Sequence, residues 1–140
     1  METKVVNVKV AHIRPKYNNL SEWMNDPSNV YIGRKGIVFI NGVRYPQQNS
    51  LWHNPYKIAA STTREEVIRR YEEYIIDKIE KENLKVELLK LKDKNLGCWC
   101  KPEPCHGDIL VKLIEIYSSQ ETQSRTEIIL SECQKVQSLT

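Results

Sequence analysis

Most side chains that could do chemistry lie in one stretch, residues 96–108, which reads Leu-Gly-Cys-Trp-Cys-Lys-Pro-Glu-Pro-Cys-His-Gly-Asp. It holds three of the four cysteines and one of the three histidines. Residues two apart in a strand point to the same side, so Cys98 and Cys100 are expected to share a face. Two prolines then prevent helix formation, and Cys105 to Asp108 are expected to form the first turn of a helix.

This helix start suits two kinds of chemistry. Unpaired N–H groups and the positive end of the helix dipole lower the pKa of a thiol, which makes Cys105 a candidate nucleophile with His106 as its acid or base. The same N–H groups are suited to holding a phosphate. Asp108 is placed to favour the dipole, or to orient His106 or a substrate hydroxyl.

Zinc binding is a third hypothesis for the same stretch. Cys98, Cys100, Cys105 and His106 supply the ligand set of a Cys₃His site, so zinc is a candidate cofactor. The spacing C-x-C-x₄-C-H differs from the usual C-x₂-C pairs, and adjacent Cys and His residues rarely reach one ion together. Core packing is the remaining alternative, because free cysteines are often buried. It explains Cys98 better than it explains His106 or Asp108.

The composition is typical of an intracellular globular protein. The 140 residues are 28% charged and 40% apolar, which fits one domain with one hydrophobic core. The net charge of +3 neither argues for nucleic-acid binding by itself nor opposes it. The apolar runs are too short for a membrane-spanning helix. With no signal-peptide pattern at the N-terminus, we expect a cytoplasmic location, or the host cytoplasm for a viral protein, where thiols stay reduced.

Hydrophobic patterns predict an α/β scaffold around the central stretch. Residues 5–10, 29–34 and 96–100 are rich in strand-forming side chains. Residues 37–45 predict a β-hairpin, because an Asn-Gly pair separates two β-rich runs. Strands that alternate with helices indicate a small Rossmann-like sheet flanked by helices, with the hairpin as an insertion.

The helices and the tail complete the predicted organisation. Thr62, with a glutamate three residues later, is expected to begin a long helix with one buried face. Residues 109–117 predict a helix with a wide apolar face. We expect one α/β domain over residues 1–117, followed by a polar C-terminal tail at 118–140 that holds a docking helix. Cys133 in that tail is expected to be incidental.

Further candidate ligand-binding residues follow the predicted strands. Because ligands of open α/β sheets bind beyond the carboxyl ends of the strands, these residues are expected to converge at one rim of the sheet. Arginine there suits a phosphate, glycine allows close backbone approach, and aromatic rings suit a planar group. The candidates are His12, Arg14, Gly33, Arg34, Trp52, Asn54 and Tyr56. The alternatives are a solvated loop for His12 and Arg14, a tight turn with a surface arginine for Gly33 and Arg34, and capping of the core by the loop that holds Trp52, Asn54 and Tyr56.

Five segments of this chain resemble an uncharacterised family, Domain of Unknown Function 4326. They are residues 97–108 (GCWCKPEPCHGD), 5–8 (VVNV), 31–34 (YIGR), 54–56 (NPY) and 63–66 (TREE). The resemblance covers roughly residues 5 to 117, and the chain departs from the family pattern by carrying the hairpin. It implies a compact α/β domain of a kind met in bacteria, phages and viruses, and it implies no established activity.

Two functions are therefore weighed. The first is binding of a phosphorylated, nucleotide-like ligand, with Cys105 and His106 as the reactive pair and nucleotides or modified bases as the substrate class. The second is a non-enzymatic, zinc-stapled module whose partner is nucleic acid or another protein. Neither reading involves a membrane.

Overall fold

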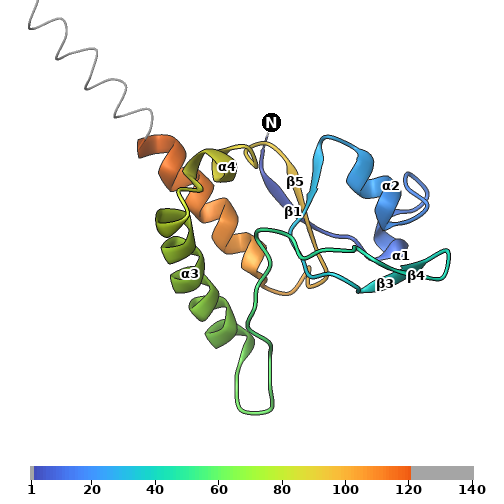
Figure 1. The fold of residues 1–140 in the computed structure, drawn as a ribbon, viewed down its shortest axis with the longest axis horizontal. Coiled ribbons are helices and arrows are strands. Elements are labelled where there is room, and N and C mark those ends of the chain that lie inside the picture. Colours follow the sequence, from blue (N-terminus) through green and yellow to red (C-terminus); the bar gives the residue numbers. More distant parts are fainter. Residues whose placement is uncertain (1, 121–140) are drawn as a thin grey trace, which may run out of the picture.

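The computed structural model describes residues 2–120 and builds them around a three-stranded parallel sheet (Figure 1). The strands lie in the order β1-β5-β2, where β1 is Lys4–Asn7, β5 is Asn95–Cys98 and β2 is Asn29–Tyr31. The strand that leads into the cysteine-rich stretch is therefore the central one. The predicted α/β class is confirmed, and the Rossmann-like detail stays a prediction.

Helices cover both faces of the sheet. On one face lie α3 (Arg64–Lys81), α4 (Lys85–Leu89) and a final helix at 106–120; on the other lie α1 (Val10–Ile13) and α2 (Leu20–Asn25) (Figure 1). Each face has its own core, because side chains alternate along the strands. The first core includes Tyr71, Ile75, Leu96, Cys98, Leu110 and Ile114, and the second includes Val8, Leu20, Trp23 and Tyr31.

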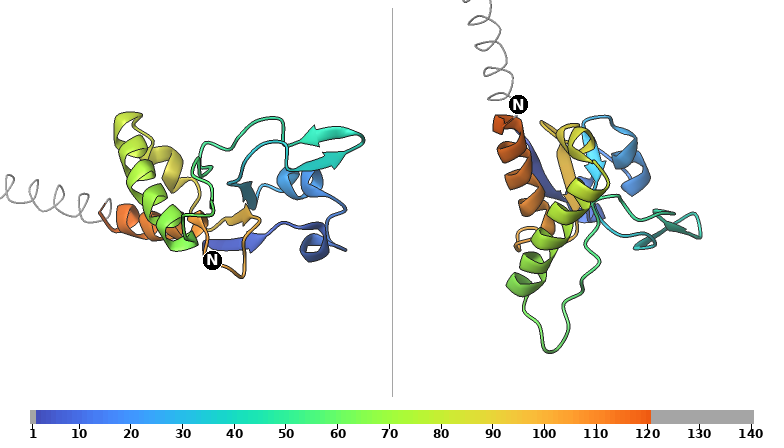
Figure 2. Two further views of the ribbon diagram at one scale, coloured as in Figure 1. Left: turned by 90° about the horizontal axis from the view of Figure 1, so that it is seen from below. Right: turned by 60° about the vertical axis from the view of Figure 1, so that its left-hand side comes forward.

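The predicted hairpin is present and projects from the body of the molecule (Figure 2). Strand β3 (Val38–Ile40) pairs antiparallel with β4 (Val43–Tyr45). Asn41 and Gly42 both have positive φ angles, 52° and 78°, as the two central residues of a type I′ turn require. The Asn-Gly signal in the sequence was therefore sufficient to place this element.

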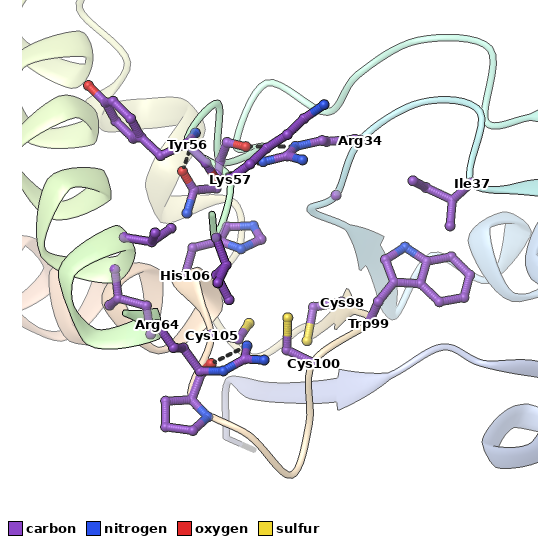
Figure 3. Close-up of a pocket in the computed structure, with 16 residues that line it drawn as sticks. Arg34, Ile37, Tyr56, Lys57, Arg64, Cys98, Trp99, Cys100, Cys105 and His106 are labelled. Carbon is purple, nitrogen blue, oxygen red and sulfur yellow. Dashed lines mark hydrogen bonds between the residues drawn. The ribbon is translucent and has the colours of Figure 1, made fainter. Parts of the chain in front are cut away.

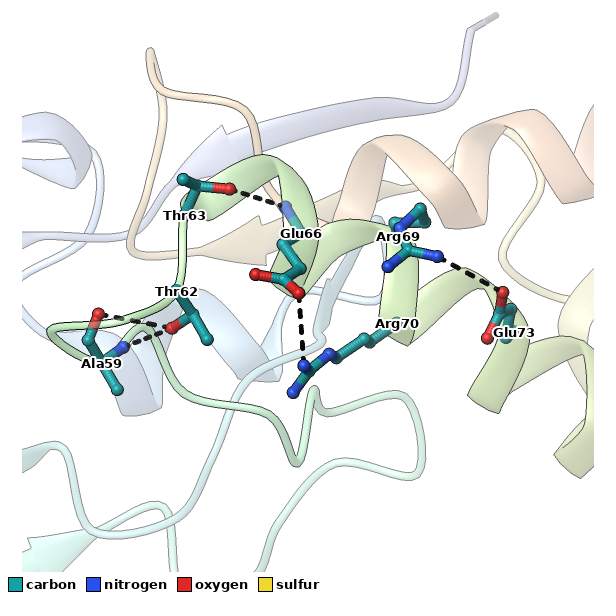
Figure 4. A network of polar contacts seen from close by, with 7 residues as sticks. All are labelled: Ala59, Thr62, Thr63, Glu66, Arg69, Arg70 and Glu73. Atoms are coloured by element: carbon teal, nitrogen blue, oxygen red, sulfur yellow. Dashed lines mark hydrogen bonds and ion pairs between the residues drawn. The ribbon is translucent and has the colours of Figure 1, made fainter.

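Helix α3 begins one residue later than the sequence predicted (Figure 4). Thr63 is its N-cap, and the Thr63 hydroxyl accepts a hydrogen bond of 3.2 Å from the Glu66 backbone N–H. The Thr62 hydroxyl instead accepts a 2.7 Å bond from the N–H of Ala59 in the preceding turn. Either of the two adjacent threonine hydroxyls could cap the helix, but the Thr62 hydroxyl is already hydrogen-bonded within the preceding turn.

The first strand is shorter than predicted. Residues 5–10 were expected to be extended, but β1 ends at Asn7 and α1 begins at Val10. The Asn7 side chain accepts a 2.9 Å hydrogen bond from the Lys9 N–H and donates a 2.6 Å bond to the Lys101 carbonyl. Such a local side-chain bond to the backbone competes with the strand ladder and turns the chain.

The last helix begins at residue 106 and continues through residue 120. The first turn was expected at Cys105 to Asp108, so the helix begins one residue later than predicted and continues three residues past the predicted end at 117. The docking helix expected in the tail and Cys133 lie outside the described residues. No helix within residues 2–120 has both the length and the apolar character that crossing a membrane requires.

Candidate functional site

A cavity of about 380 Å³ opens at the carboxyl ends of β2 and β5 (Figure 3). Four segments form it: the end of β2, the loop before α3 with the first turns of α3, the end of β5, and the start of the last helix. Its volume falls in the range of ~300–1,000 Å³ that is common for small-molecule sites. It is lined by Gly33, Arg34, Ile37, Asn54, Tyr56, Lys57, Ile58, Arg64, Val67, Ile68, Cys98, Trp99, Cys100, Pro104, Cys105 and His106.

Three cysteine sulfurs meet at the floor of this cavity (Figure 3). Cys98 and Cys100 lie on the same side of the chain, as the alternation predicts, while Trp99 packs with the opposite core. Cys105 precedes the last helix, and its sulfur accepts a 3.2 Å hydrogen bond from the Gly107 N–H. The Cys105 thiol also hydrogen-bonds both Cys98 and Cys100. Cys98 and Cys105 are buried and Cys100 is half-buried.

The thiols differ in acidity. A hydrogen bond from the Cys105 thiol and the nearby Arg64 guanidinium lower the pKa of Cys100 to about 6. The Cys105 hydrogen bond likewise lowers the pKa of Cys98 to about 7. The pKa of Cys105 is raised by its interactions with the sulfurs of Cys100 and Cys98 and by its own burial. The sequence favoured Cys105 as the thiolate, whereas these contacts favour Cys100.

The His106 side chain lies in the cavity wall, where it contacts buried residues of the core. Its Nε2 lies 2.7 Å from the Ile32 carbonyl oxygen, and its ring meets the Tyr71 ring edge to face at a centroid distance of 5.0 Å. Burial lowers the pKa of His106 to about 4. The neutral ring therefore donates its Nε2 proton to the Ile32 carbonyl, an arrangement that fixes the first turn of the helix against β2.

We expect the His106 imidazole to stay neutral between pH 5 and pH 8. Its pKa is about 4 in the folded chain and ~6.5 when unfolded, so the unfolded chain takes up the proton first. The free energy of unfolding should therefore fall as the pH drops from about 6.5 towards 4. Nitrogen-detected NMR titration of the ring measures the first effect, and urea unfolding at several pH values measures the second. A ring midpoint between pH 5 and pH 8 would contradict the assignment.

The Asp108 carboxylate stabilises the start of the last helix beside the cavity. One of its carboxylate oxygens accepts a 3.0 Å hydrogen bond from the Cys105 N–H, and the other lies 2.6 Å from the Lys101 ammonium. The carboxylate thus caps the last helix and ties the proline-rich loop to it. The Asp108 hydrogen bond also raises the pKa of Lys101. The expected contact between Asp108 and His106 is absent from the hydrogen bonds of the described residues.

The cavity wall is positively charged. Arg34, Lys57 and Arg64 line it, and no carboxylate of the described part of the chain does. Arg34 donates 2.8 Å hydrogen bonds from Nε and Nη2 to the carbonyls of Asn54 and Tyr56, so it also holds the loop in place. Arg64 donates a 3.2 Å bond to the Pro104 carbonyl. Within residues 2–120 none of these three cations pairs with a carboxylate, and Arg64 also lies close enough to the Cys100 thiol to lower its pKa.

With the geometry established, the chain can be compared with known proteins. The model of a family described as a domain of unknown function, DUF4326, matches residues 16–116. The chain belongs to this family. The DUF4326 match includes every residue that lines the cavity. No solved structure gives a significant match.

Two viral proteins are similar to this DUF4326 member. An uncharacterised protein of Acanthamoeba polyphaga mimivirus is 34% identical over 99 residues, which cover 63% of this chain and 70% of that protein. An uncharacterised 12.4 kDa protein from the nrdA-td intergenic region of Enterobacteria phage T4 is 35% identical over 68 residues. That match covers 48% of this chain and 62% of the phage protein.

Several predicted ligand-binding residues of the DUF4326 domain do meet at one rim. Gly33, Arg34, Asn54 and Tyr56 line the cavity together with the cysteines and His106. The convergence follows from the parallel sheet, since β2 and β5 end at the same edge.

Three predicted residues lie elsewhere. His12 and Arg14 are exposed on and just after α1, because the chain turns at Asn7 instead of continuing as a strand. Trp52 is buried in the core, where its carbonyl accepts a 2.7 Å hydrogen bond from the Tyr71 hydroxyl. The expectation that these side chains reach the same rim was wrong.

The sequence reading missed three residues of the site. Trp99 was expected only to pack, yet it lines the cavity while its indole N–H donates a 2.8 Å bond to the Tyr31 hydroxyl. Lys57 and Arg64 were not selected at all. A signal for Arg64 existed, because a cation in the first turn of a helix opposes the helix dipole and so suggests a role other than stability.

The zinc hypothesis gains no support from the site geometry. Within residues 2–120, no group of three or more His, Cys, Asp or Glu side chains is arranged to hold a metal ion. His106, the fourth expected ligand, uses its Nε2 on the Ile32 carbonyl.

Proposed function

We propose that this protein binds a phosphorylated, nucleotide-like ligand in the cavity, where Cys100 presents the most acidic of the three thiols. One observation carries the proposal: a cavity of about 380 Å³ is lined by three cations without carboxylate partners and by an acidic, half-buried thiol. Perturbed titratable groups in a cleft are associated with functional sites.

The phosphate would lie among the basic side chains. Arg34, on the loop after β2, and Lys57 lie near each other at one end of the cavity, and Arg64, at the start of α3, lies at the other end near the cysteines (Figure 3). An arginine presents a planar fork of donors that matches phosphate oxygens. This arrangement assigns anion binding mainly to side chains, with the helix start at Cys105 as the nearest backbone contribution.

The planar part of the ligand would lie against Trp99. The sequence favoured Trp52 or Tyr56 for stacking, but Trp52 is in the core and Tyr56 packs edge to face on Tyr74, with centroids 6.0 Å apart. Trp99 lies at the wall between the cysteines and the apolar side chain of Ile37. A purine or pyrimidine ring placed there would be close to the thiol floor.

Replacing Arg64 by glutamine is expected to weaken nucleotide binding at least about tenfold, because a charge-assisted hydrogen bond contributes ~1.5–3 kcal/mol. Isothermal titration calorimetry with nucleoside monophosphates, the matching nucleosides and inorganic phosphate measures this. The monophosphates should bind more tightly than the nucleosides. Lys57→Gln, which removes a cation with no hydrogen bond in the described structure, should act in the same direction.

Arg69→Gln is the matched control, since Arg69 is an exposed arginine of the same helix, paired with Glu73 and outside the cavity. It should leave binding unchanged. Equal binding of nucleosides and monophosphates, or equal losses for Arg64→Gln and Arg69→Gln, would rule out the phosphate site. Thermal unfolding of each variant separates lost binding from lost folding.

A further inference from the structure

The segment that surrounds the cavity mouth has an unusual charge. Residues 27–64 carry five arginines and lysines and no aspartate or glutamate, although the whole chain has a net charge of only +3. The rest of the chain is therefore net negative. Three of the five cations line the cavity, and the other two, Lys35 and Arg44, are exposed at the base of the hairpin and on β4. A segment whose charges all have one sign favours an extended anion as its partner.

The hairpin presents an aromatic ring to solvent. Phe39, the only phenylalanine of the chain, is 64% exposed, and the Arg44 guanidinium carbon lies 4.8 Å from its ring centroid. Phe39 and Arg44 are directly opposite in the β3–β4 register, whereas Val38 and Ile40 pack against the second core. An outward aromatic beside an arginine contributes nothing to the core and is suited to stacking on a base.

Hydrogen bonds hold the hairpin in place where it joins the cavity. The Gly36 N–H donates a 2.8 Å hydrogen bond to the Pro46 carbonyl, and Arg44 donates a 3.0 Å bond to the Gly36 carbonyl. Ile37, the residue between Gly36 and β3, lines the cavity. The Phe39–Arg44 pair therefore belongs to an arm that starts at the cavity wall and projects outward (Figures 2 and 3).

We propose that the nucleotide-like ligand is one unit of a single-stranded nucleic acid, and that the hairpin binds the strand next to it. This inference rests on the proposed function, since the cavity would hold one unstacked nucleotide. A base cannot reach a thiol at the bottom of a cavity while it is stacked in a duplex. Phe39 then stacks on a neighbouring base, and Lys35 and Arg44 contact the phosphates that follow.

Charge complementarity favours nucleic acid over a protein partner for this arm. Each carboxylate near the arm would repel a polyanion, which explains a run of 38 residues that contains none. A hairpin that binds a protein would not need to exclude carboxylates in this way. The apolar exposure at Phe39 alone would fit either partner. Phe39 together with the basic segment favours single-stranded nucleic acid as the partner.

Fluorescence anisotropy with the full chain tests the proposal. The probes are labelled single-stranded DNA and RNA of about 12 nucleotides, within the site sizes of comparable binders, the same sequence as a duplex, and a labelled nucleoside monophosphate. The single strands should bind at least about tenfold more tightly than the monophosphate or the duplex. Phe39→Ala should weaken strand binding about tenfold and leave the monophosphate unaffected. Arg44→Gln should lower the salt slope of strand binding by ~0.7.

Two variants provide matched controls. Val86→Ala shortens an apolar side chain that is 68% exposed on α4, and Lys4→Gln removes an exposed cation at the opposite edge of the sheet. Neither should change strand binding. Equal affinity for strand and monophosphate, with no effect of Phe39→Ala, overturns the hairpin proposal and leaves the cavity function standing. Strand binding that depends on Phe39 but not on Arg64 instead supports the hairpin and rejects the nucleotide cavity. Self-association abolished by Phe39→Ala, without strand binding, assigns the arm to a protein contact and overturns the proposal.

Discussion

Changing Cys100 to serine is expected to remove the fast reaction of this protein with iodoacetamide at pH 7, slowing alkylation of the site at least about tenfold. The reason lies in the ionisation of the three thiols. Cys100 has a pKa of about 6 and is half-buried, so it is mostly ionised at pH 7, whereas an ordinary thiol is only a few per cent ionised. Cys98 and Cys105 are buried beneath it.

The alkylation rate of Cys100 should depend on pH. Because the pKa of Cys100 is lowered, its alkylation rate should rise as the pH passes through about 6 and should level off near pH 7. Mass spectrometry of the digested protein assigns the label to individual cysteines. A rate that keeps rising up to pH 9 would show that Cys100 is an ordinary thiol.

Cys105→Ala separates the two candidate nucleophiles. It removes the hydrogen bond that contributes most to lowering the pKa of Cys100, so the pH profile of Cys100 should move to higher pH while the label stays on Cys100. The opposite outcome, in which Cys105→Ala removes the fast reaction and Cys100→Ser leaves it intact, would restore the role that the sequence assigned to Cys105.

Local patterns in the sequence were enough to locate the site. The two-residue period of a strand placed Cys98 and Cys100 on one side, and the prolines before Cys105 placed the start of the last helix. The rule that ligands bind at the carboxyl ends of parallel strands brought Arg34 to the same rim. Each of these inferences needs only neighbouring residues and one general property of sheets.

The remaining features depend on contacts between distant segments. Cys105 contributes most to the acidity of Cys100, and Arg64 adds to it. Arg64 and Cys100 line the same cavity although they are far apart in the sequence. No local pattern specifies the path of the loop before α3. The failure at His12 has a similar origin, because the bond from Asn7 to the Lys101 carbonyl spans most of the domain. Such a contact turns a chain whose β-branched residues alone favour a longer strand.

Gly97, one residue before Cys98, is a position where the fold leaves no room for a side chain. It lies in the central strand β5, and a Cβ added there would fall on the ring of Trp23 and within 2.6 Å of Val8 Cγ1. Both neighbours are buried, at 3% and 1% exposure, so neither can move into solvent. The absence of a side chain at Gly97 is what allows α2 to place Trp23 directly against the sheet.

Gly97→Ala is therefore expected to lower the free energy of unfolding by ~3 kcal/mol, at the upper end of the usual cost of overpacking a core. Urea unfolding followed by circular dichroism measures the change. Trp23→Phe provides the internal test, since it removes the ring atoms that the new methyl group would meet. Alone it should destabilise the protein, but in the Gly97→Ala background it should cost less or recover stability, because the two positions are coupled. Additive losses would show that the strand relaxes around the methyl group and that the packing of Trp23 does not limit residue 97.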